Sequence, residues 1–155
     1  MTTKITGANV NTLSLGVVNG VIQTTLAAAL EKVTISATAA TGTINYDLST
    51  QSILYYTSNA GPANWTVNIR GNSGTTLNSM MATGQSVTMT FLVTQGATAF
   101  YNSAVTIDGT SVTPKWLGGS APSAGNINGV DVYTYTVIKT GSAAYTVFAS
   151  QSRYA

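Results

Sequence analysis

Three short strand-like runs within residues 42–71, of which the first and the last have a two-residue period, constrain the fold of this chain most strongly. In the first run Ile44 and Tyr46 alternate with polar residues, and in the last run Val67 and Ile69 do the same. This alternation is typical of a β-strand that buries one face and exposes the other. The stretch therefore predicts a protein built on β-sheets.

Comparable runs follow one another from residue 33 to the C-terminus and are separated by Gly, Asn, Pro and Ser. The spacing is typical of an all-β sandwich or barrel. We predict an all-β domain in residues 31–155, an antiparallel β-sandwich with jelly-roll-like or Greek-key connections. About nine strands are expected, at 33–38, 42–48, 53–57, 65–70, 86–94, 100–107, 111–116, 129–139 and 144–150. Asp108-Gly109 predicts a two-residue hairpin turn, because Gly tolerates the positive φ that such a turn requires.

Residues 1–30 have a different character. They are mostly polar and interrupted by Gly, so we interpret them as an extended N-terminal arm for docking or oligomerisation. The alternative is that they supply a first strand to the chain's own sheet. Helix formers cluster only at 27–32, where we expect at most one short helix. The apolar run 13–30 holds too many polar residues for a signal peptide or a membrane span, so no membrane insertion is expected.

Charge is scarce in this sequence. Only 6% of the residues are charged, against roughly 25% in ordinary globular proteins, while 44% are hydrophobic. A surface of hydroxyl and amide groups has few charges to keep molecules apart, so we expect neighbouring molecules to cover part of it. The six bases are scattered and give a net charge of +2. Without a basic cluster, a nucleic-acid partner is not expected.

The residue types leave little room for catalysis. The chain has no Cys and no His, which excludes Ser-His-Asp and Cys-His chemistry and metal sites built on those side chains. Glycoside hydrolysis would need a carboxylate pair, but Glu31, Asp47, Asp108 and Asp131 each have a structural interpretation at a turn, a helix or a strand border. The loop 126–131 has too few carboxylates for calcium. We expect no enzyme activity, no cofactor and no metal.

Two groups of residues are predicted to form an interface. Trp65 shares a face with Val67 and Ile69 and is expected in the core, which leaves the opposite face of that strand for a neighbouring subunit. Strand 129–139 carries apolar or aromatic residues on both faces, so it is either central in the sandwich or covered by a partner. The predicted interface residues are Asn64, Asn68, Arg70, Tyr133 and Tyr135. Alternatively, Arg70 pairs with Asp47 or Asp131.

Several short motifs carry a resemblance to a known family. They are Thr43-Ile44-Asn45-Tyr46-Asp47, Tyr55-Tyr56-Thr57, Asn64-Trp65-Thr66, Asn68-Ile69-Arg70-Gly71, Ile107-Asp108-Gly109-Thr110, Trp116 with Gly118-Gly119, Asp131-Val132-Tyr133 and Ile138-Lys139-Thr140. Together they resemble a module of structural proteins of marine tailed bacteriophages, cyanophages in particular. The resemblance extends from about Glu31 to the C-terminus. It carries no catalytic or ligand residues.

The resemblance implies a bacteriophage virion protein, a surface-exposed β-domain assembled in the host bacterial cytoplasm and attached to capsid or tail as a decoration or fibre-like subunit. Its partners would be other virion proteins and copies of itself, with a trimer favoured because many phage fibres are trimers. Only about thirty residues precede the module, so we expect a stand-alone subunit rather than the tip of a long fibre. The alternative is a receptor- or glycan-binding tail-fibre tip that uses loops 71–84 and 117–129. Its expected host-contact residues are Asn78, Trp116, Asn126 and Asn128.

Overall fold

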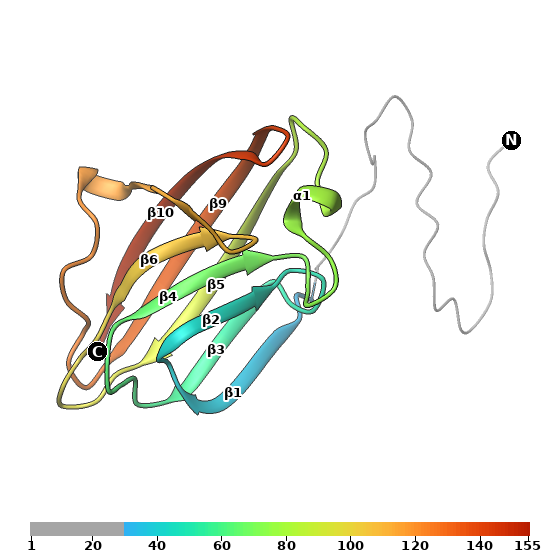
Figure 1. Cartoon of the computed structure of the whole chain (residues 1–155). Coiled ribbons are helices and arrows are strands. Elements are labelled where there is room, and N and C mark those ends of the chain that lie inside the picture. Colours follow the sequence, from blue (N-terminus) through green and yellow to red (C-terminus); the bar gives the residue numbers. More distant parts are fainter. Residues whose placement is uncertain (1–29) are drawn as a thin grey trace, which may run out of the picture. The chain divides into compact units, whose positions relative to one another are not determined.

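The computed structural model describes residues 30–155, which form ten β-strands in two facing sheets and one single-turn helix (Figure 1). The elements are β1 (Val33–Ala39), β2 (Gly42–Asp47), β3 (Ile53–Ser58), β4 (Trp65–Arg70), α1 (Leu77–Met80), β5 (Ser86–Thr94), β6 (Asn102–Ile107), β7 (Thr110–Val112), β8 (Lys115–Trp116), the 3-10 turn η1 (Leu117–Gly119), β9 (Val130–Gly141) and β10 (Ala144–Tyr154). The predicted arm and most of the predicted short helix lie outside the described residues. Residues 30–32 are described and are not helical.

The two sheets are mixed, so the predicted antiparallel sandwich is wrong in its strand directions. The six-stranded sheet has the order β1-β3-β5-β9-β10-β8 and the four-stranded sheet the order β2-β4-β6-β7. Five of the eight pairings are parallel. The reason is that the chain changes sheet at every connection from β1 to β6, so that sheet neighbours are two strands apart in sequence and run the same way. The strand of the opposite sheet serves as the crossover that parallel pairing requires.

The expected strand 111–116 is two strands in different sheets. Residues 110–112 pair with β6 in the four-stranded sheet, whereas 115–116 pair with β10 in the six-stranded sheet. Pro114 lies between them and has no N–H to donate to a ladder, so the chain crosses from one sheet to the other there. The predicted Asp108-Gly109 hairpin is confirmed, with Ile107 opposite Thr110 and positive φ at both turn residues.

Aromatic side chains fill the space between the sheets. Trp65 projects from the four-stranded sheet and meets Phe91 and Tyr133 of the other sheet edge to face, at centroid distances of 6.3 and 6.0 Å. All three side chains are at most 1% exposed. The predicted core position of Trp65 is confirmed, and β4 and β5 alternate because one face of each packs between the sheets while the other faces outward.

Helix α1 closes one end of the space between the sheets, and a charge from each sheet holds it. The Asp108 carboxylate accepts hydrogen bonds from the backbone N–H groups of Leu77 (2.6 Å) and Asn78 (3.0 Å) at the start of the helix. At its end, the buried Lys139 ammonium donates to the carbonyl oxygens of Asn78 and Met81. The two charges match the polarity of the helix ends and satisfy backbone groups that one turn leaves unpaired.

Candidate functional site

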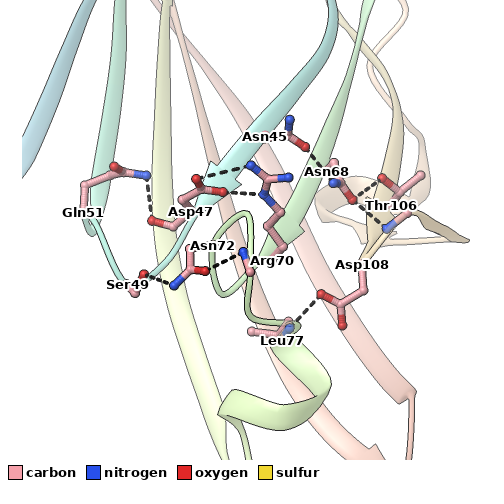
Figure 2. Close-up of polar contacts among 12 residues, drawn as sticks. Asn45, Asp47, Ser49, Gln51, Asn68, Arg70, Asn72, Leu77, Thr106 and Asp108 are labelled. Carbon is pink, nitrogen blue, oxygen red and sulfur yellow. Dashed lines mark hydrogen bonds and ion pairs between the residues drawn. The ribbon is translucent and has the colours of Figure 1, made fainter.

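The outer face of the four-stranded sheet carries a ladder of polar side chains (Figure 2). Asn45, Asn68 and Thr106 occupy the same level of β2, β4 and β6. The Asn68 amide donates to Asn45 Oδ1 (2.8 Å), and its own Oδ1 accepts from the Thr106 hydroxyl (2.8 Å) and the Gly109 N–H (2.9 Å). The register places one polar residue from each of three strands side by side, and their hydrogen bonds join them into one connected network.

An ion pair extends this ladder by one level. Arg70 and Asp47 are direct neighbours in register, and Arg70 Nε donates to Asp47 Oδ1 at 2.6 Å. The hydrogen bond that Arg70 donates to Asp47 raises the pKa of the Arg70 guanidinium. Both side chains are about a quarter exposed, so solvent screens much of the attraction and the pair positions the side chains more than it stabilises the fold. The alternative in which Arg70 pairs with Asp47 is therefore the one that the structure contains.

A polar hollow of about 350 Å³ adjoins the ladder. It is lined by Asn68, Arg70, Asn72, Ser73, Gly74, Thr75, Thr76, Asp108 and Gly109. Many of its polar groups are already occupied, since Asn72 accepts from Gly74 N–H and donates to Ser49, and Asp108 caps α1. The hollow offers hydrogen bonds to a polar molecule or to another protein surface, with no acid and base placed to exchange a proton.

The remaining acids also have structural contacts. Asp131 is fully buried and accepts from Gln95 Nε2 (2.8 Å), Gln151 Nε2 (3.0 Å) and the backbone N–H of Asn126 (3.0 Å). It thereby links the long loop 117–129 to β10 and to Gln95, which directly follows β5. Glu31 is exposed and accepts from the Ser52 hydroxyl at 3.1 Å.

The structure brings together only two of the five predicted interface residues. Asn68 and Arg70 lie on the outer face of the four-stranded sheet, whereas Asn64 precedes β4 and accepts a hydrogen bond from the Tyr101 N–H at 3.1 Å. Tyr133 and Tyr135 are fully buried between the sheets, so they cannot contact a partner at the surface of this domain. Strand β9 is central in its sheet, and only one of its faces is buried, with Tyr133 and Tyr135 on that face and the opposite face half-exposed.

The predicted host-contact residues are spread over the domain and mostly serve local structure. The Asn78 side chain accepts from Ala143 N–H (2.8 Å), and the Asn126 side chain donates to the Tyr154 carbonyl (2.7 Å). Asn128 is exposed and has a positive φ of 56°. Trp116 is half-buried, and its ring meets Tyr135 at 6.3 Å.

Of a second hollow, sequence reasoning named only Trp116 and the start of loop 117–129; this hollow lies on the six-stranded sheet along β9, β10 and β8. Its volume is about 470 Å³, and Lys115, Leu117 and Phe148 are among the residues that line it. Lys115 and Phe148 are far apart in sequence, and only the parallel pairing of β8 with β10 makes them neighbours. The sequence did contain one indication of this hollow, because Phe148 is an aromatic residue at an outward-facing position of a strand with an alternating pattern.

Comparison with known proteins leaves the family open: no family model, no curated protein and no solved structure matches this chain. Within residues 30–155, no helix has the length and apolar character needed to cross a membrane. The same residues contain no group of three or more acidic, His or Cys side chains able to hold a metal ion.

Proposed function

We propose that this protein is a structural component of a bacteriophage particle, a surface-exposed β-domain attached to capsid or tail that associates with copies of itself. The resemblance of its motifs to structural proteins of marine tailed phages supports the class of particle. The contacts of the four acids support a structural role, because each one accepts at least one hydrogen bond from another residue of the domain. A stoichiometry of three is the one expected by analogy with phage fibres.

One observation carries the self-association: the edge strand β1 is uncharged and apolar on its outer face. Strand β1 pairs only with β3 among the described strands and ends the six-stranded sheet. Its sequence VTISATA contains no charge and no Pro, and Val33 and Ile35 are 44% and 69% exposed. Proteins that remain monomeric protect such edges with charges, Pro or irregular pairing. Here the irregularity is a register shift between Ser36 and Ala39, and no strand within residues 30–155 pairs with the outer edge of Val33–Ser36.

The outer face behind this edge continues the apolar character. Register places Ile35, Tyr55, Leu92 and Val132 in one row across β1, β3, β5 and β9. None of these side chains is charged, so the surface of a neighbouring copy would meet no repulsion there. An uncharged edge strand beside an uncharged row of side chains suits association with an identical copy better than association with a charged partner protein.

The location is tested on the particle. Purified particles of the phage that encodes this protein are expected to contain it in a fixed ratio to the major capsid protein by quantitative mass spectrometry. An antibody against the chain should label capsid or tail in electron micrographs. Detection of the protein only in infected-cell lysate, with none in washed particles, would overturn the structural proposal.

The edge is tested by Ile35→Lys in the full chain. Because Ile35 is 69% exposed, the variant should fold, while the new charge should weaken association by about tenfold or more in dissociation constant. Light scattering over a dilution series measures this. Thr43→Lys adds the same charge to the edge strand β2 and serves as the matched control. A wild-type chain that is monomeric at all concentrations, or an Ile35→Lys chain that associates like wild type, contradicts the edge model.

A further inference from the structure

The hollow on the six-stranded sheet has the size and lining of a ligand site. Its volume of about 470 Å³ lies within the range of small-molecule sites, roughly 300–1,000 Å³. Three segments contribute to it, and only the fold brings them together. The lining residues are Lys115, Trp116, Leu117, Gly118, Thr134, Thr136, Phe148, Ala149 and Ser150.

Phe148 forms an aromatic surface in this hollow. Its neighbours Val147 and Ala149 are buried, whereas Phe148 points to the opposite side of β10 and is 46% exposed. Register places it between Thr136 of β9 and Lys115 of β8. The face of an aromatic ring carries partial negative charge, which attracts the polarised C–H groups on the apolar side of a sugar ring.

Hydroxyl groups lie beside the aromatic ring. Thr134 and Ser150 are opposite each other in register, and neither side chain has a hydrogen-bond partner among residues 30–155. Thr136 shares one hydrogen bond of 2.9 Å with Thr88 and keeps further capacity. A hydroxyl both donates and accepts, as the hydroxyl groups of a saccharide do.

The charge of the hollow selects among saccharides. Lys115 is the charged residue of the lining, and its Nζ lies 5.8 Å from the centroid of the Phe148 ring. It forms no ion pair with a described residue, and none of Glu31, Asp47, Asp108 or Asp131 lines the hollow. An anionic group bound next to Phe148 would therefore meet one unpaired positive charge and no negative one.

We propose that this hollow binds a saccharide that carries a carboxylate. The apolar side of the sugar ring lies against Phe148, the hydroxyls of Thr134 and Ser150 bond to sugar hydroxyls, and Lys115 pairs with the carboxylate. This binding activity goes beyond the structural role proposed above and can be measured on the isolated chain. A chain that binds no saccharide can therefore still be a structural component of the particle, and a chain absent from the particle can still bind a saccharide.

The test is a titration of the ¹⁵N-labelled full chain, followed by NMR of backbone amides. The acidic probes are methyl glucuronide and the methyl glycoside of N-acetylneuraminic acid, and the neutral probe is methyl glucoside. We expect shifts at the amides of Lys115, Leu117, Phe148 and Ser150. At least one acidic probe should bind about fivefold more tightly than the neutral one, the effect of a solvent-exposed ion pair.

Three substitutions separate the contributions. Phe148→Leu keeps an apolar side chain and the fold but removes the flat ring, and it should abolish the shifts caused by every probe. Lys115→Gln should lower the affinity for the acidic probe to that for the neutral one, about fivefold. Lys32→Gln removes an exposed charge elsewhere and should change nothing.

Several results would overturn the proposal. They are the absence of shifts at these amides with both acidic probes, shifts confined to the hollow beside Arg70, and a Lys115→Gln chain that keeps its preference for the acidic probe. An unchanged amide spectrum away from the hollow in each variant shows that the fold is intact, so loss of binding reports on the site.

Discussion

Replacement of Trp65 by alanine is expected to lower the free energy of unfolding by about 3 to 5 kcal/mol, as for other large aromatic residues removed from a core. Trp65 is 1% exposed and lies between Phe91 and Tyr133, so the neighbouring rings cannot move far enough to fill the space. Strand β4, which carries Trp65, is paired on both sides and transmits any shift to β2 and β6. Urea denaturation followed by circular dichroism measures the change.

Trp65→Phe distinguishes packing from hydrogen bonding. The indole N–H of Trp65 is buried and has no hydrogen-bond partner, so phenylalanine removes an unsatisfied donor and loses only part of the volume. We expect this variant to be clearly more stable than Trp65→Ala. An alanine variant within about 1 kcal/mol of wild type would show that Trp65 does not organise the core.

The strand positions could be predicted because alternation depends on local sequence. The runs around Trp65 and Phe91 alternate as the faces of a two-sheet structure require, and both became central strands. Strand direction could not be predicted in this way. A turn of two residues after Ala39 is compatible with a hairpin, yet the chain there passes to the opposite sheet. Whether the chain forms a hairpin or passes to the opposite sheet depends on pairing with β3 and β4, two strands that lie later in the sequence.

The candidate sites depend still more on long-range pairing. Arg70 and Asp47 could be proposed as partners because few charges were available, and the parallel register of β2 with β4 makes them neighbours. The buried position of Tyr133 and Tyr135 was one of two alternatives, because a central strand and a strand covered by a partner have the same sequence pattern. No sequence pattern predicts that Lys115 lies next to Phe148. The two residues become neighbours because the chain passes into the six-stranded sheet at Pro114, and a change of sheet leaves no periodic pattern in the sequence.

Stability should fall steeply above about pH 10, where free tyrosine side chains ionise. Tyr46, Tyr133 and Tyr135 are fully buried, and burial raises the pKa of each phenol well above its ordinary value. The nearby Asp131 carboxylate raises the pKa of Tyr133 further. In this range the unfolded chain loses at least these three protons that the folded chain keeps, so unfolding releases protons and becomes more favourable as the pH rises.

Each such group contributes about 1.4 kcal/mol per pH unit, so the three together should lower the unfolding free energy by about 4 kcal/mol per unit above pH 10. Below that pH all three phenols are protonated in both states and this dependence disappears. Urea denaturation at a series of pH values measures the slope.

Tyr46→Phe should reduce the slope by about 1.4 kcal/mol per pH unit, since it removes one of the contributing groups. The Ser52 carbonyl, which Tyr46 contacts, keeps its hydrogen bond from the Thr90 N–H, so this variant should remain folded. Tyr154→Phe is the matched control, because Tyr154 is 58% exposed, and it should leave the slope unchanged. A slope that is the same in wild type and Tyr46→Phe would mean that Tyr46 ionises as readily in the folded chain as in the unfolded one. Tyr46 lies under the polar ladder of β2, so that result would also show that water reaches the space between the two sheets from this side.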